Sequence, residues 1–263
     1  MNKMRFIIFV IIIEIITTNL IYAQVYVSNE DTRSTMVTAG VVLGLAYSVR
    51  SSDFEPLTET SINGLMNKQL LQINQFAVNN FNDDLALVSD VLLALSISIS
   101  ALQVFDGRVK DEWTTYGMML LETGAISGGL TTIAKGIVRD ARPYVYSPDA
   151  PLEFKQTIDA RQSFFSGHAC LSFAAMTLFA ETYSNYYPDN SNHNLIWLGA
   201  MSLASTTSIL RVLSGRHFPI DILVGAAIGF TAGKLIPHIH ENSNQNKIPD
   251  FRINRVLNVS LKF

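Results

Sequence analysis

Six apolar stretches separated by polar connections are the feature that most restricts how this chain can fold. Most have an uncharged core of about 12–17 residues, shorter than the roughly 20 residues of a typical membrane-spanning helix. Asp90 and Glu122 interrupt two of them. The pattern predicts an all-α bundle of about six core helices, membrane-embedded with functional polar groups or soluble with a buried core. The stretches are roughly Thr35–Val49, Leu85–Phe105, Trp113–Ala134, Phe165–Thr182, Leu195–Leu213 and Ile220–Ile236.

Composition favours membrane contact without requiring it. Charged residues make up 16% of the 263 residues, below the roughly 25% of an ordinary soluble domain, yet the mean hydropathy is only +0.24. The length fits one domain better than two. A net charge of −3 argues against a nucleic-acid partner, and the single cysteine, Cys170, excludes an internal disulfide framework.

The first residues have the features of an export signal. Lys3 and Arg5 precede the short apolar run Phe6–Ile16, and a cleavage region ends at Ala23. Residues 1–23 are therefore predicted to be a signal peptide. Because Glu14 is unusual within such a run, an uncleaved membrane anchor is the alternative interpretation.

The rest of the chain is predicted to have three parts. Residues 24–84 form an N-terminal helical segment that packs on the bundle, residues 85–237 form the catalytic core, and residues 238–263 form a polar tail. Within the first part, Ser61–Phe81 carries apolar residues at helical spacing, which predicts one amphipathic helix. The tail ends in the strand-like alternation Leu257–Phe263, to which we assign no function.

The first chemically informative cluster is Lys135, Arg142 and Pro143. Because proline disfavours helix for the preceding residue, Arg142 is expected where the chain leaves a helix that Lys135 closes. Two cations directed at one point would bind a phosphate dianion. The alternative is a basic helix end that complements the helix dipole.

The second cluster is Ser166, Gly167 and His168. Ser166 precedes an apolar stretch and is a natural N-cap, while Gly167 lets a ligand approach the backbone. The following amides favour an anion, and His168 would be placed to protonate a leaving oxygen. An ordinary capped helix with a histidine in its first turn is the alternative.

The third cluster is Arg211, His217 and Asp221. Pro219 fits the first position of a helix, so His217 is expected just before that helix. Asp221 can accept a hydrogen bond from one imidazole nitrogen and leave the other free to attack phosphorus. The alternative is a helix hairpin with a structural histidine–aspartate pair. If consecutive helices run antiparallel, all three clusters meet at one end of a central four-helix core, which favours metal-free phosphate-ester chemistry.

These clusters resemble the type-2 phosphatidic acid phosphatase superfamily, which includes bacterial acid phosphatases and vanadium haloperoxidases. Its pattern is Lys-(six residues)-Arg-Pro, Pro-Ser-Gly-His and Ser-Arg-(five residues)-His-(three residues)-Asp. The resemblance covers about residues 85–237. Two positions depart from it, since Phe165 replaces the proline and Leu210 replaces the serine before the arginine.

The resemblance implies a role for each matched residue. His217 would be the nucleophile and form a phosphohistidine, Asp221 would orient it, and His168 would protonate the leaving group and then activate water. No metal or other cofactor would be needed. The phosphate would be held by Lys135, Arg142, Arg211, Ser166 and Gly167.

The substrate is expected to be a lipid-linked phosphate, either phosphatidate-like or a polyprenyl diphosphate. A soluble periplasmic acid phosphatase of broad specificity is the alternative, followed by a vanadium haloperoxidase. A third class is a binding or structural helical protein whose motifs are inactive. The loop Arg142–Ser163, with Tyr144, Tyr146 and Phe154, would either cover a lipid headgroup or admit soluble esters. The oligomeric state is left open.

Charge asymmetry predicts the orientation. The connection Asp106–Glu112 carries two basic residues and the tail beyond Ile236 carries four. If five helices span, the positive-inside bias places both in the cytoplasm, so the site faces the periplasm of an exported envelope protein. Counting Thr35–Val49 as a sixth span behind a cleaved signal would reverse this orientation.

Overall fold

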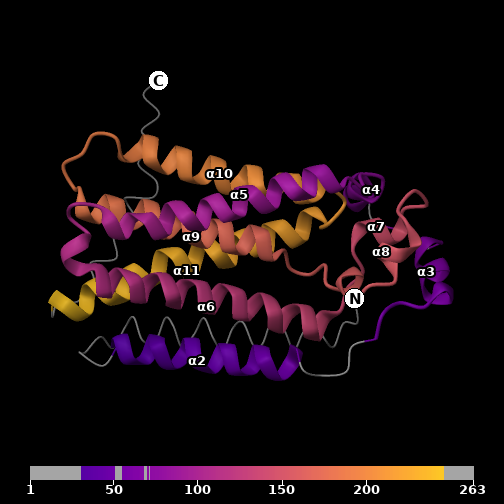
Figure 1. Ribbon diagram of the computed structural model, residues 1–263, viewed down its shortest axis with the longest axis horizontal. Coiled ribbons are helices and arrows are strands. Elements are labelled where there is room, and N and C mark those ends of the chain that lie inside the picture. The colour runs from indigo at the N-terminus through magenta and orange to yellow at the C-terminus, as the bar shows by residue number, and fades with distance from the viewer. Residues whose placement is uncertain (1–30, 51–54, 68–69, 71, 246–263) are drawn as a thin grey trace.

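The computed structural model describes residues 31–50, 55–67, 70 and 72–245, and the regular structure in this part of the chain is helical. Six of its helices have 20 or more residues and lie side by side along the long axis of the molecule (Figure 1). This confirms the predicted all-α bundle. The predicted signal peptide and the strand-like tail lie outside the described residues. The long helices are α2 (Asp31–Arg50), α5 (Asp83–Leu102), α6 (Trp113–Val138), α9 (Gly167–Tyr186), α10 (His193–Leu213) and α11 (Pro219–Gln245).

Local chemistry sets several of the helix boundaries. The side chain of Asn82 accepts a hydrogen bond from the backbone amide of Leu85, 2.9 Å away, and so caps the start of α5. The hydroxyl of Ser166 caps α9 in the same way. Helix α6 ends at Val138 because Arg139 adopts a left-handed backbone conformation with φ of 53°.

The prediction of one helix over Ser61–Phe81 is wrong, because two short helices occupy this region. They are α3 (Glu59–Met66) and α4 (Gln72–Val78). At the end of α3, both the backbone and the side-chain nitrogen of Asn67 donate to the carbonyl of Asn63. An Asx side chain that competes for helical carbonyls in this way favours termination of the helix.

The short helices gather at one end of the bundle and form a cap. Helices α7 (Pro143–Tyr146) and α8 (Leu152–Lys155) and the 3-10 turn Asp159–Arg161 lie there with α3 and α4 (Figure 1). The loop aromatics Tyr144 and Tyr146 are buried in the apolar core of this cap rather than spread over its surface. Other core members of the cap are Ile62, Ala77, Val145, Ala160 and Phe218.

Helices α9 and α11 approach each other closely along a row of glycines. Gly225, Gly229 and Gly233 are four residues apart and therefore lie on one face of α11. A Cβ atom at any of them would lie within 2.5 Å of a backbone oxygen of α9, so only glycine fits. The oxygens belong to Ser166, Cys170 and Ala174. This packing fixes the start of α9 against the first turn of α11.

Helix α2 runs parallel to α6. A Cβ at Gly129 would contact Val42, and a Cβ at Gly136 would contact Val49. From the first pair to the second, the residue number rises by seven on both helices, which is the pattern of two parallel helices. Because α6 ends at the cap, α2 begins at the opposite end of the bundle.

Three helices among the described residues are long and apolar enough to cross a membrane. These segments are Asp83–Phe105, His193–Leu213 and Pro219–His240. Much of their apolar surface faces outward; Leu87, Leu198 and Leu223 are each more than 60% exposed. The apolar part of α2, Thr38–Tyr47, is shorter. An outward-facing apolar belt of this kind suits contact with lipid better than contact with water.

Candidate active site

His217 lies in the turn between α10 and α11 and is 1% exposed. The turn closes because the backbone amides of Arg216 and His217 both donate to the carbonyl of Arg211. Gly215, with φ of 69°, supplies the left-handed conformation that this reversal requires. The local fold therefore returns His217 toward the end of the helix that carries Arg211.

The two ring nitrogens of His217 have different neighbours. Nε2 lies 3.2 Å from Nη1 of Arg142, and Nδ1 lies 3.6 Å from Oδ2 of Asp221. A guanidinium can only donate, so Nε2 accepts and the proton of the neutral ring resides on Nδ1, facing the carboxylate. The Nδ1–Asp221 separation is longer than a hydrogen bond. In this arrangement Nε2 carries no proton, as attack on phosphorus requires, and an anion bound at Arg142 would lie beside it.

The electrostatic environment keeps His217 neutral. Burial holds the pKa of the imidazole well below its ordinary value of 6.5, because a charged ring would lose its hydration. Nearby positive charges oppose protonation as well. A group with a lowered pKa stays unprotonated as the pH falls below its ordinary value, so the ring is neutral at pH 7. The cations that contribute are Arg142, Lys135 and Arg211.

Asp221 accepts hydrogen bonds from two donors, neither of them the histidine. Its Oδ2 accepts from the hydroxyl of Ser163 at 2.6 Å and from the amide of Phe218 at 2.9 Å. Asp221 is 1% exposed. These bonds compensate for removing the carboxylate from water and fix its position beside His217. Ser163 was not among the residues that the sequence singled out.

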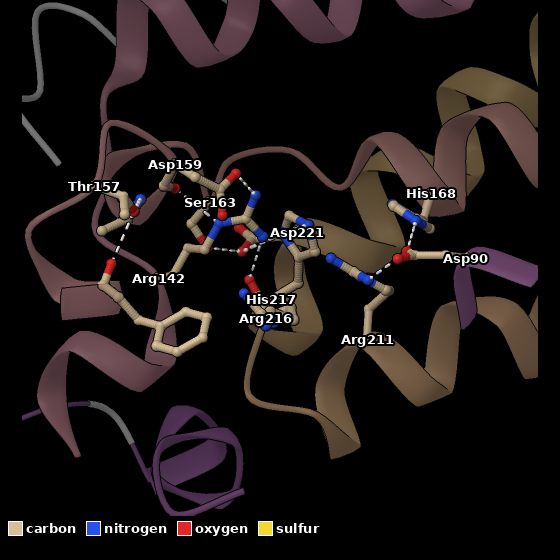
Figure 2. A network of polar contacts seen from close by, with 12 residues as sticks. Asp90, Arg142, Thr157, Asp159, Ser163, His168, Arg211, Arg216, His217 and Asp221 are labelled. Carbon is tan, nitrogen blue, oxygen red and sulfur yellow. Dashed lines mark hydrogen bonds and ion pairs between the residues drawn. The ribbon is translucent and has the colours of Figure 1, made fainter. Parts of the chain in front are cut away.

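Arg142 is anchored on every side of its guanidinium (Figure 2). Nε donates to the carbonyl of Asp159 at 2.8 Å, Nη2 to the Asp159 carboxylate at 2.6 Å, and Nη1 to the carbonyl of Arg216 at 2.9 Å. Arg142 precedes Pro143 in an extended conformation, as predicted. Burial alone would raise the pKa of Asp159, but the charges of Arg142 and Lys135 hold that pKa below its ordinary value. The carboxylate is therefore ionised at neutral pH and pairs with the guanidinium.

The side chain of Lys135 lies beside Gly167 at the start of α9. A Cβ at Gly167 would lie 3.9 Å from Nζ of Lys135 and 3.0 Å from Cγ2 of Thr131. The amide of Ser166 donates to the carbonyl of Asp221 at 3.0 Å, which ties the start of α9 to the third cluster. A helix N-terminus with an adjacent ammonium group is a favourable place for an anion.

His168 and Arg211 meet at a carboxylate on another helix. His168 Nε2 lies 2.6 Å from Oδ1 of Asp90, and Arg211 Nη1 lies 3.0 Å from the same oxygen (Figure 2). The hydroxyl of Ser89 accepts a second bond from Nη1 of Arg211, at 2.9 Å. The sequence offered one signal for Asp90, a charge that interrupts an apolar stretch, but gave no indication of its partners.

All eight residues predicted from the three clusters thus lie at the cap end of the bundle, at or beside the ends of α6, α9, α10 and α11. Three other histidines lie elsewhere. His238 and His240 pair with different carboxylates, Glu181 at 3.1 Å and Glu122 at 2.8 Å, and His193 contacts a backbone carbonyl. Phe165, which replaces the proline of the family pattern, is fully buried in the core of the bundle.

A buried histidine–aspartate pair and convergent cations lie together at one end of a helical bundle, an arrangement suited to holding an anionic group beside a nucleophile. The family model of the PAP2 superfamily matches residues 116–245, which include all three clusters. The chain belongs to the PAP2 superfamily.

Two individual proteins are each similar to part of the chain. A lipid A 1-phosphatase of Porphyromonas gingivalis is 37% identical over 76 residues, which is 29% of this chain and 16% of that protein. The chain therefore matches less than a fifth of the length of this relative. The crystal structure of a transmembrane PAP2-type phosphatidylglycerolphosphate phosphatase from Bacillus subtilis has a TM-score of 0.47 and 22% identity, covering 85% of this chain and all of that one.

Proposed function

We propose that the protein hydrolyses phosphomonoesters or diphosphates of lipids without a metal ion, through a phosphohistidine at His217. The observation that carries the proposal is the environment of His217: a buried neutral imidazole with Nε2 at Arg142 and Nδ1 toward Asp221. Family membership supports the same chemistry. Asp221 would stabilise the ring as it becomes positively charged in the reaction.

The reaction would proceed in two displacements. In the first, Nε2 of His217 forms a bond to phosphorus as the bond to the leaving oxygen breaks, and His168 gives that oxygen a proton. In the second, water gives a proton to His168 and attacks phosphorus, and His217 departs with inorganic phosphate as the product. The charge on the transferring phosphoryl group would be stabilised by Lys135, Arg142, Arg211 and the amide of Gly167.

A lipid substrate is favoured by the surroundings of the site. The three span-length helices α5, α10 and α11 each have one end at the cap, so a substrate anchored in a bilayer can reach the candidate residues from the side. The similar protein of Porphyromonas gingivalis is named for a lipid phosphate, the 1-phosphate of lipid A. We therefore assign the substrate to the class of phosphorylated lipids.

Phosphate release by the purified protein tests this assignment. Phosphatidate and a polyprenyl diphosphate in detergent would be compared with a soluble aryl phosphate, all with EDTA present. We expect release that persists in EDTA and a kcat/KM for one of the lipids at least about tenfold above that for the aryl phosphate. Equal or better hydrolysis of the aryl phosphate would instead identify a broad-specificity acid phosphatase. Vanadate-dependent halide oxidation without phosphate release would identify a haloperoxidase.

We further propose that the cap faces the periplasm. The connection Asp106–Glu112, with Arg108 and Lys110, lies at the opposite end of the bundle and would then be cytoplasmic. Because α2 is parallel to α6, residue 31 lies at the cytoplasmic end if α2 also spans. A signal that crosses once from the inside, whether cleaved after Ala23 or retained as an anchor, would place that residue outside, so a periplasmic cap agrees with such a signal only if α2 does not span.

Cysteine labelling gives a clear test of this orientation, because the single native cysteine, Cys170, is buried. Gly107 has open space around its Cα, and Glu153 is exposed on the cap. A membrane-impermeant maleimide applied to spheroplasts should label Glu153→Cys at once and Gly107→Cys only after lysis. The reverse pattern would contradict a periplasmic site. Early labelling of Glu153→Cys together with loss of residues 1–23 in intact mass spectrometry would mean that the signal is cleaved and that α2 does not span.

A further inference from the structure

Asp90 is a candidate-site residue that lies outside the three sequence clusters. It lies on α5, before the residues 116–245 that match the family model. One of its carboxylate oxygens contacts both His168 and Arg211, at 2.6 and 3.0 Å (Figure 2). Its side chain is 54% exposed, so the two contacts are not forced by burial in a core.

The contact with His168 determines which ring nitrogen can exchange a proton. A carboxylate at Nε2 accepts the N–H of that nitrogen, so the proton transferred in the reaction must occupy Nδ1. In the first displacement the imidazolium loses the Nδ1 proton to the leaving oxygen. In the second displacement Nδ1 regains a proton from water. Asp90 retains its bond to the Nε2 N–H throughout and stabilises the charged ring.

The site therefore contains two histidine–aspartate pairs with different environments. His217 and Asp221 are 1% and 2% exposed in their side chains, whereas His168 and Asp90 are 23% and 54% exposed. A buried neutral imidazole suits attack on phosphorus. Burial and the charge of Arg211 lower the pKa of His168 to about 4, and the carboxylate of Asp90 opposes this shift, so Asp90 is the group that favours the protonated ring.

The contact with Arg211 fixes a phosphate-binding group. Nη1 of Arg211 is held by Asp90 and by the buried hydroxyl of Ser89, while Nε of Arg211 is buried without a hydrogen-bond partner in the described part of the chain. Because Nη1 is fixed and Nε still has an N–H to donate, the guanidinium is suited to bind an anion in one orientation. Of the two candidate-site side chains, Ser89 contacts Arg211 but not His168, whereas Asp90 contacts both Arg211 and His168.

We propose that Asp90 is a positioning residue for the general acid–base His168 and for Arg211, so that α5 completes the active site. This proposal rests on the proposed function. Its particular consequence is that Asp90 matters most when the leaving oxygen needs a proton. An alkyl phosphate has a strongly basic leaving group that needs protonation, whereas a 4-nitrophenyl phosphate does not.

The test compares Asp90→Asn with Ser89→Ala on these two substrates. Asparagine keeps the size of Asp90 but removes its charge. We expect Asp90→Asn to lower kcat by about 100-fold on the alkyl phosphate and by about tenfold or less on 4-nitrophenyl phosphate. Ser89→Ala should lower kcat/KM on both substrates by the same factor. Asp84→Asn, the same substitution in the first turn of α5, is the matched control and should equal the wild type.

Two further measurements separate positioning from loss of structure. In a His168→Ala background, Asp90→Asn should cause no additional loss specific to the alkyl phosphate. Asp90→Glu should recover part of the alkyl-phosphate activity because it restores the charge. Equal losses on both substrates for Asp90→Asn would overturn the proposed link to His168. A wild-type protein that hydrolyses neither substrate nor lipid would overturn the proposed function itself.

Discussion

Replacing His217 with alanine is expected to reduce phosphate release by about 10,000-fold or more. The substitution removes the atom that would bond to phosphorus, and nucleophile replacements in enzymes that act through covalent intermediates cause losses of this order. The effect should appear in kcat on lipid and aryl substrates alike. The measurement is the initial rate of phosphate release in detergent, with thermal unfolding as a check on the fold.

His193→Ala is the matched control for this variant. It removes the same side chain at the opposite end of the bundle, where His193 contacts a backbone carbonyl. Its activity should stay within about twofold of the wild type. Acid-labile, alkali-stable label from a radioactive substrate should be trapped on the wild-type protein and not on His217→Ala. Unchanged turnover by His217→Ala would remove this residue from the mechanism and favour a binding or structural role for the chain.

The parts of the site that could be predicted from the sequence are those fixed by local chemistry. Ser166 caps α9 because a serine before an apolar stretch satisfies the free amides of the first turn. Arg142 is extended because it precedes proline, and Pro219 begins α11. Each of these residues stands at a helix end, so alternation of helix direction was enough to bring the three clusters together.

The parts that could not be predicted depend on contacts between distant segments. Asp90 meets His168 and Arg211 across 78 and 121 residues of sequence, and Ser163 meets Asp221 across 58. The loop aromatics were open to a role over the substrate, yet Tyr144 is fully buried in the cap because its ring packs at the edge of Phe81, 5.8 Å between centroids. Composition and spacing carry no information about such pairings.

Arg142→Lys should lower kcat/KM by about 1,000-fold although it preserves the positive charge. Lysine is a single point donor and cannot reproduce the fork that joins Asp159, Arg216 and His217. The carbonyls of Asp159 and Arg216 would lose their bonds from Nε and Nη1, and Nε2 of His217 would lose the donor that fixes its tautomer. The variant should therefore lose both phosphate affinity and the orientation of the nucleophile.

The split between kinetic parameters distinguishes these two losses. Weaker phosphate binding alone would raise KM and leave kcat unchanged, whereas a misoriented His217 lowers kcat at saturating substrate. We expect both changes, with the larger part in kcat, because Arg142 contacts the reacting nitrogen directly at 3.2 Å. Arg108→Lys, the same exchange at the opposite end of the bundle, should leave both parameters near wild type. A rise in KM with an unchanged kcat would mean that Asp221 and its two donors, Ser163 and the amide of Phe218, orient the histidine without help from the guanidinium.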